Sequence, residues 1–196
     1  MRDKRIAFVT SNEHKFREVK VILEEYGIEV EHSQLAIVEI QAMRIEEIAS
    51  AKAKSAYEIL RRGVIVEDDA LAIDALNGFP GPYSSYVFKT IGNEGILRLM
   101  HNIKDRSASF ISVIAYCSSS SSDGEPLIFV GKVDGIIAES IRGNGWGYDP
   151  IFIPKGSSRT YAEMGDDEKN RVSHRRLAVE QFAAWLKGNA ILQRKM

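Results

Sequence analysis

The stretch RIAFVTSNEHKFREVKVILEEYG, residues 5–27, defines the first elements of the fold. Its first six residues are mainly apolar and rich in β-formers, which is typical of a short buried strand. Four larger apolar residues then recur at helical spacing: Phe16, Val19, Leu23 and Tyr26. Asn12 stands in the position of an N-cap, and Gly27 stands where the helix should stop. The stretch therefore predicts a strand, a turn and an amphipathic helix.

Strand and helix patterns alternate along the rest of the first half. Residues 28–32 predict a second strand, and residues 45–62 predict a helix that ends before Gly63. Residues 64–66 form an apolar run of the kind found in strands covered on both faces, and three acids, residues 67–69, follow it. This alternation predicts an α/β fold with some parallel strand pairing.

The second half has longer strand patterns. Residues 107–117 and 126–133 alternate in part, and the polar segment 118–124 joins them, so we expect two antiparallel strands and a long loop. A third strand is predicted at residues 135–141, and an amphipathic helix at residues 173–187. Four residues of this helix are expected to face inward: Leu177, Phe182, Trp185 and Leu186. Because the chain shows no repeat and no clear linker, residues 1–196 are expected to form one domain.

Composition excludes several classes of protein. Lys and Arg number 26 against 27 Asp and Glu, a net charge of −1, so nucleic acid is not expected as the main partner. No apolar stretch approaches the roughly 20 residues that span a bilayer, and no signal-peptide pattern stands at the start, so no membrane partner is expected. The single cysteine, Cys117, fits a reducing compartment. We expect a soluble cytoplasmic protein.

The first polar segment that is a candidate functional site is the predicted strand-to-helix turn. It contains Thr10, Ser11 and Asn12, and Lys15 follows in the first helical turn. Helix N-termini present N–H groups and a positive dipole end, so this turn predicts a phosphate site. The alternative is a simple helix cap beside a solvated lysine.

The second segment is the acidic triplet Glu67, Asp68 and Asp69. Carboxylates this close repel one another unless one binds a partner or changes its pKa. Sites in open α/β sheets collect at the carboxyl ends of strands, and Mg²⁺ prefers oxygen ligands shared with substrate phosphates. The triplet therefore predicts a metal or catalytic site, with a solvated acidic loop as the alternative.

Two more segments carry groups that suit a nucleotide base. Residues 143–150 place three glycines around Trp146 and Tyr148, a pattern that lets the backbone approach a ligand and an aromatic face stack on a base. Residues 169–175 are dense in hydrogen-bond donors. The alternatives are a hairpin turn with incidental aromatic residues and an ordinary exposed helix start.

Taken in order, four stretches of this sequence resemble the inosine triphosphate pyrophosphatase family, also called Ham1-like. The stretches are TSNEHKFREVK (10–20), EDDALAIDALNGFPGPYSSYV (67–87), GNGWGYDPIFIP (143–154) and TYAEMGDDEKNRVSHR (160–175). The pair GWGYDPIF and EKN…SHR is the most specific part of the match. Together the stretches span nearly the whole chain.

The resemblance implies an elongated, two-lobed α/β fold with a central mixed β-sheet, flanking helices and a nucleotide-binding groove between the lobes. It also implies a homodimer that sanitises the nucleotide pool. Its substrates would be non-standard purine nucleoside triphosphates such as ITP, dITP and XTP. Cleavage would fall between the α- and β-phosphates, with Mg²⁺, and would give the monophosphate and pyrophosphate.

Residue roles follow from the resemblance in the same way. Asp68 takes the position of the catalytic carboxylate that acts on the attacking water. The implied metal ligands are Glu39, Glu67 and Asp68. The implied substrate-binding residues are Thr10, Ser11, Asn12, Lys15, Lys52, Trp146, Gly147, Tyr148, Asp149, Lys169, Ser173, His174 and Arg175. Among them, Trp146 takes the position of the aromatic residue that stacks on the base.

This chain departs from the family pattern at two places. It has Ser11 where the family often has glycine, and Asp69 and Ala70 where the family often has serine and glycine. Serine is less free in backbone angle than glycine, and alanine does not favour a positive-φ turn.

Base choice is expected to follow from hydrogen-bond sign. Hypoxanthine and xanthine present a 6-oxo acceptor, which donors from Lys169, His174, Arg175 and backbone N–H groups favour over the 6-amino donor of adenine. Two alternative functions stay open. A metal-dependent phosphatase, or a nucleotide phosphohydrolase without base selectivity, would use the same acids and lysines, whereas in a nucleotide sensor without turnover the acids would be structural.

Overall fold

The structure is a computed structural model that describes residues 6–119 and 125–193. The chain divides into two compact units. Unit 1 comprises Met1–Asp68, Ser112–Gly131 and Arg175–Met196, and unit 2 comprises Asp69–Ile111 and Lys132–His174. Three long strands pass from one unit into the other: β3 (Val64–Ile73), β4 (Ser107–Cys117) and β5 (Leu127–Ile137).

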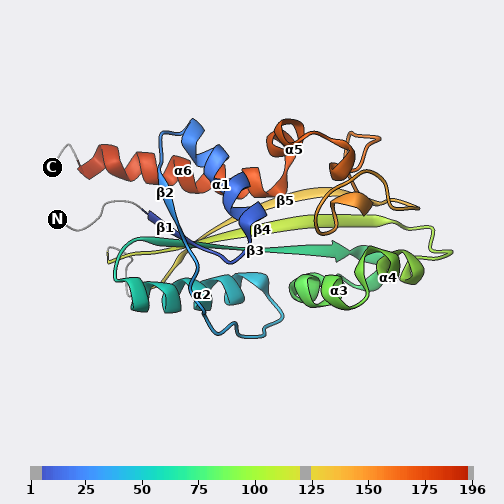
Figure 1. The fold of residues 1–196 in the computed structure, drawn as a ribbon, viewed down its shortest axis with the longest axis horizontal. Helices are drawn as coiled ribbons and strands as arrows, with labels where there is room; N and C mark the ends of the chain where they lie inside the picture. The colour runs from blue at the N-terminus through green and yellow to red at the C-terminus, as the bar shows by residue number, and fades with distance from the viewer. Residues whose placement is uncertain (1–5, 120–124, 194–196) are drawn as a thin grey trace. The chain divides into compact units, whose positions relative to one another are not determined.

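These strands belong to a six-stranded sheet with the order β2-β1-β3-β4-β5-β6. β1 (Ile6–Val9) pairs in parallel with β2 (Val30–Ser33) and with β3. At the other edge, β5 pairs antiparallel with β6 (Phe152–Pro154). The expected α/β class with a central mixed sheet and flanking helices is therefore confirmed (Figure 1).

Three helices cover the strands of unit 1. α1 (Glu13–Glu25) and α6 (His174–Gln193) lie on one face, and α2 (Ile45–Leu60) lies on the other (Figure 1). Asn12 caps α1 as predicted, and Gly27 follows its end at φ 66°. The core between α1, α6 and the strands contains fully buried residues that include Phe8, Ile22, Ile65, Ile114, Val179 and Phe182.

Unit 2 uses shorter elements. They are η1 (Asp74–Leu76), η2 (Gly81–Tyr83), α3 (Ser84–Thr90), α4 (Gly92–Leu99), η4 (Asp149–Ile151), η5 (Tyr161–Glu163) and α5 (Asp166–Val172). Its own core includes Leu71, Ile96, Phe110, Ile137, Phe152 and Tyr161. The sequence patterns had not predicted α3 or α4.

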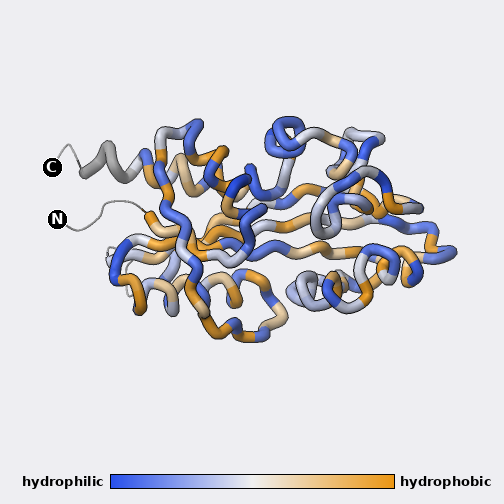
Figure 2. The backbone as a smooth tube through the Cα atoms, in the orientation of Figure 1, coloured by the Kyte–Doolittle hydropathy of each residue, from blue (hydrophilic) through white to orange (hydrophobic). Residues whose placement is uncertain are grey.

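Strand β3 is longer than predicted. The apolar run 64–66 was expected to end at the acids, but the strand continues through them to Ile73. The acids can lie inside a strand because Glu67 and Asp68 have cationic partners there. The tube of β3 turns from hydrophobic to hydrophilic at this point (Figure 2). Ala70 lies in the strand and is buried, so no positive-φ turn is needed after the acids.

Two further predictions differ from the structure, and a third lies mostly outside the described residues. Residues 126–133 and 135–141 were predicted as separate strands, but β5 runs unbroken through Gly135 and ends at Ile137. A Cβ atom at Gly135 would lie 2.3 Å from the Ile153 carbonyl oxygen, so this glycine permits a close strand approach and does not mark a break.

Leu177 was expected to face inward but is 41% exposed, because the buried face of α6 runs through Ala178, Val179, Phe182 and Ala183. The polar segment 118–124 lies mostly outside the described residues.

None of the helices in the described ranges combines the length and the apolar character that crossing a bilayer requires.

Candidate active site

The turn before α1 is fixed by its own polar side chains. Asn12 Oδ1 accepts hydrogen bonds from the N–H groups of His14 and Lys15, at 2.9 and 3.3 Å. The Asn12 N–H in turn donates to Thr10 Oγ1 at 3.1 Å, while Ser11 is exposed. Asn12 therefore caps the helix, and the predicted phosphate turn leads directly to the Lys15 side chain.

Lys15 belongs to a buried charge network around Glu67. Lys15 Nζ lies 2.8 Å from Glu67 Oε2, and Ser112 Oγ donates to Glu67 Oε1 at 2.7 Å. Arg175 Nε donates to the same Oε1 at 3.2 Å, and Arg175 also pairs with Glu18. Glu67 and Arg175 are 2% and 1% exposed. Two cations thus compensate the Glu67 carboxylate in the interior of unit 1.

Asp68 lies on the opposite face of β3. Consecutive strand residues point to opposite faces, so Glu67 faces α1 and α6 while Asp68 faces α2. Lys52 Nζ, from α2, lies 2.9 Å from Asp68 Oδ1 and 2.5 Å from Glu39 Oε1. One lysine therefore brings the Glu39 and Asp68 carboxylates together.

Burial shifts the charge equilibria of this pair. Loss of solvent raises the pKa of Asp68 above its ordinary value, although the nearby charges of Lys52 and Lys15 act in the opposite direction. Burial alone would lower the pKa of Lys52, but the Asp68 and Glu39 carboxylates outweigh it and raise that pKa. Asp68 is therefore a stronger proton acceptor than an exposed aspartate, beside a lysine that stays charged.

The oxygens of Glu39 and Asp68 suit a hard divalent cation. Asp68 Oδ2 is buried and accepts no hydrogen bond from the described residues, and Glu39 is 60% exposed at its side chain. The described residues hold no cluster of three or more metal-ligating side chains. Mg²⁺ commonly uses one or two carboxylates and takes its other ligands from substrate phosphates and water. Two carboxylates at this point fit that pattern, whereas Glu67 lies in its own ion-pair network, and its role as a metal ligand stays a prediction.

Within unit 2, the glycine-rich loop surrounds a second ion pair. Lys169 Nζ lies 2.6 Å from Asp149 Oδ2, and both side chains are almost fully buried. The same ammonium lies 5.1 Å from the centroid of the Trp146 ring. Three of the predicted base-site residues are therefore brought together, and the Lys169 charge is shared between a carboxylate and an aromatic face.

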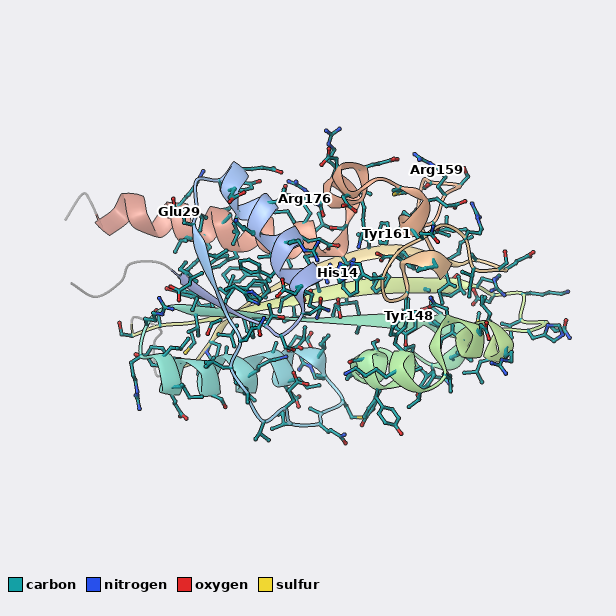
Figure 3. All side chains as sticks on the ribbon, viewed as in Figure 1. His14, Glu29, Tyr148, Arg159, Tyr161 and Arg176 are labelled. Atoms are coloured by element: carbon teal, nitrogen blue, oxygen red, sulfur yellow. The ribbon has the colours of Figure 1, made fainter. Side chains whose placement is uncertain are left out.

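Tyr148 anchors the same loop to α3. Its hydroxyl donates to the Ser84 carbonyl oxygen at 2.9 Å, and its ring packs edge-on against Phe88. Tyr148 is labelled in Figure 3. Burial raises the pKa of Tyr148, and the charge of Asp69 adds to the shift. Gly147 lies beside it at φ 61°, a conformation that favours glycine.

Ser173 and His174 are buried at the end of unit 2. The His174 ring stacks on Phe110 with centroids 4.4 Å apart and an interplanar angle of 6°, and Tyr161 lies beyond it at 6.2 Å. The predicted contact of His174 with the base stays a prediction, and the stack shows how its ring is oriented.

Sequence reasoning missed several residues that hold the site. Ser112 could have been noticed as a polar residue in the buried strand 107–117, and Glu18 as an acid one helical turn after Lys15. Phe110, which stacks on His174, and Asn93, whose Nδ2 donates to the Gly147 carbonyl oxygen, gave no signal, because their partners lie more than 50 residues away along the chain.

The chain is similar in sequence to proteins of one family over nearly its whole length. A sequence profile of the Ham1 family matches residues 6–185. The chain is 52% identical to the dITP/XTP pyrophosphatase of Methanopyrus kandleri, over 94% of this chain and 97% of that protein. It is 50% identical to the dITP/XTP pyrophosphatase of Thermococcus kodakarensis, over 94% of this chain and 98% of that protein.

Solved structures give the same result for the fold. A HAM1 protein from Coxiella burnetii matches with a TM-score of 0.83 and 32% identity, covering 94% of this chain and 98% of that chain. The Ham1 protein of Staphylococcus aureus matches with a TM-score of 0.81 and 32% identity, covering 95% of this chain and 100% of that chain. The similarity therefore extends over nearly the whole length on both sides.

Proposed function

This chain belongs to the Ham1 family, and from that premise we propose that it hydrolyses non-standard purine nucleoside triphosphates to the monophosphate and pyrophosphate. The proposed substrates are dITP, XTP and ITP. The observation that carries the proposal is the partly buried Asp68 carboxylate held by Lys52, in a chain whose relatives are named dITP/XTP pyrophosphatases. The proposal includes the residue roles that the four sequence segments imply.

Lys15 and Lys52 bind the triphosphate and compensate its charge. Their side chains are 13% and 15% exposed, and each ammonium group is paired with carboxylates. Phosphoryl transfer depends mainly on such positioning and charge stabilisation. Arg175 is buried against Glu67 and Glu18, which supports a role in holding Glu67, and through it Lys15, alongside any contact with phosphate.

Asp68 orients the attacking water and accepts its proton. The raised pKa of Asp68 supports this role, because a proton acceptor works best when its pKa approaches the working pH. Lys52 keeps the Asp68 carboxylate in place through Oδ1. Asp68 Oδ2 is the oxygen that accepts no other hydrogen bond among the described residues.

We propose Mg²⁺ as the cofactor, held by Glu39 and Asp68. When bound, the ion supplies positive charge that compensates the phosphate oxygens. Glu39 suits this task because its side chain is 60% exposed, so that solvent and a cation can reach its carboxylate, while Lys52 keeps it near Asp68.

Base selection is proposed for the loop of Trp146 and the residues that follow it. Trp146 stacks on the base, and Lys169 is the buried donor beneath the ring. A 6-oxo purine offers acceptors to such donors, whereas adenine offers an amino group and leaves them unpaired.

A cytoplasmic homodimer completes the proposal. The single cysteine fits a reducing compartment. Three aromatic residues on η2 and α3 are exposed: Tyr83, Tyr86 and Phe88. In the proposed homodimer, a second copy of the chain would bury them. Light scattering coupled to size exclusion measures the oligomeric state directly.

The decisive experiment is product analysis with ITP and ATP side by side, each with Mg²⁺ and with chelator. Pyrophosphate and IMP from ITP, little cleavage of ATP and no reaction with chelator are the expected results. Release of orthophosphate, or equal cleavage of ATP, would instead support a general metal-dependent phosphohydrolase. Tight binding of ITP without turnover would support a nucleotide sensor.

A further inference from the structure

The glycine-rich loop at residues 143–149 is fixed at both ends within unit 2. A Cβ atom on Gly143 would lie 2.5 Å from the Ala162 carbonyl oxygen, so the start of the loop packs tightly against η5. The buried ion pair of Asp149 fixes the other end. Gly147 lies between these anchors at φ 61°, and has no side chain of its own that could hold it.

Asn93, the second residue of α4, supplies a restraint at this point. Its Nδ2 donates a hydrogen bond to the Gly147 carbonyl oxygen at 3.0 Å, across 54 residues of sequence. Because the peptide bond is planar and trans, fixing the Gly147 carbonyl also fixes the Tyr148 N–H, which points the opposite way. Without the bond, glycine accepts φ of either sign and the peptide can turn.

The other end of the Asn93 amide argues against a simple packing role. Asn93 Oδ1 is buried and accepts no hydrogen bond in the described part of the chain. An unpaired buried carbonyl oxygen lowers stability, so an apolar residue would fill the same space with less loss. The asparagine is therefore explained by the bond that its nitrogen donates.

We propose that Asn93 is a positioning residue for base selection, because it sets the direction of the peptide between Gly147 and Tyr148. The inference rests on the proposed function, since it takes Trp146 and the residues after it as the base-binding loop. Asn93 does not touch the base in this account. It acts through the orientation of the Tyr148 N–H, which the proposal takes as a backbone donor to the purine.

The test compares the wild type with Asn93→Ala and the isosteric Asn93→Asp. Glu94→Ala is the matched control, because Glu94 is the next residue of α4 and its side chain is 77% exposed. Calorimetry gives the dissociation constants of IMP and AMP for each protein. Inhibition of ITP cleavage by inorganic tripolyphosphate reports on the phosphate-binding residues of unit 1 without involving the base. Thermal melting shows whether each variant folds.

Asn93→Ala is expected to weaken IMP binding about tenfold and to reduce the preference for IMP over AMP, as the loss of one oriented hydrogen bond predicts. Asn93→Asp is expected to weaken it further, because its oxygen repels the Gly147 carbonyl. Tripolyphosphate inhibition should stay unchanged, and Glu94→Ala should match the wild type throughout.

Wild-type base preference in both Asn93 variants, with only the melting temperature lowered, would overturn the inference. A wild-type chain that prefers IMP in binding but does not cleave ITP would contradict the proposed function alone. In that case the binding constants of the Asn93 variants still decide the inference. A wild-type chain that binds IMP and AMP equally would overturn both.

Discussion

Replacing Lys169 with methionine is expected to destabilise the chain by about 3–5 kcal/mol, because it leaves the Asp149 carboxylate charged and buried. The two side chains are 6% and 7% exposed, and Lys169 Nζ lies 2.6 Å from Asp149 Oδ2. The lost contact with the Trp146 ring adds about 1 kcal/mol. With a urea dependence of about 2 kcal/mol per M, the combined loss of about 4–6 kcal/mol should lower the unfolding midpoint by about 2–3 M.

Two controls make this prediction specific. Lys132→Met removes the same type of side chain from the Lys132–Asp134 pair, whose members are 56% and 62% exposed, and it should cost less than about 1 kcal/mol. The double variant Asp149→Asn/Lys169→Met should recover much of the loss, because it leaves no unpaired charge. Urea unfolding followed by circular dichroism measures all three variants. A Lys169→Met loss no larger than that of Lys132→Met would refute the reasoning, since Asp149 would then have found another partner.

Four other predictions concern the charged residues around β3 and the glycine-rich loop. Asp68→Asn should lower kcat about 10²- to 10⁴-fold while KM for ITP changes little, and steady-state kinetics with near-normal turnover would contradict its role as proton acceptor. Mg²⁺ should raise the melting temperature of the wild type but not of Glu39→Ala/Asp68→Asn, and equal shifts in both would remove the proposed metal site. Glu67→Gln should cost about 3 kcal/mol of stability, because it removes a carboxylate that pairs with buried Arg175, and a neutral effect in urea unfolding would argue against the pair. Gly147→Ala should cost about 1 kcal/mol through its backbone alone, since no atom lies within 4 Å of the added Cβ; a stability equal to the wild type would show that the positive φ is not required.

Local signals predicted the elements that depend on local physics. The helix after Asn12 was predictable because an N-cap, a helical repeat and Gly27 all agree, and α1 is found there. Strand β4 has the same limits as the alternating run 107–117. These elements need little information from distant residues.

The predicted and observed strand limits differ where contacts with residues distant in sequence determine the structure. Nothing near Glu67 and Asp68 shows that a strand continues through them, because the cations that stabilise them come from positions 15, 52 and 175. Gly135 suggests a break between two strands in the sequence, whereas in the structure the backbone of Ile153 packs closely against it within a continuous strand.

The candidate site shows the same division. The resemblance named the individual residues, such as Lys52 and Asp68, because their motifs are contiguous in sequence. It did not show that Lys52 joins Asp68 to Glu39, or that Arg175 is buried against Glu67. Pairings of this kind are set by packing across the sheet, and no spacing rule along the chain encodes them.

The alternation along β3 limits which changes of chain length this protein can accept. Glu67 and Asp68 serve separate charge networks only because adjacent residues of the strand point to opposite faces. One residue inserted before Glu67 would turn its carboxylate to the face of Lys52, and would move Asp68 to the other face, two positions beyond the present place of Glu67 and its partners Lys15 and Arg175. A substitution at Glu67 or Asp68 therefore disturbs one charge network, whereas an insertion or deletion ahead of them disturbs both, and variation in length among functional descendants is expected in the connections between strands.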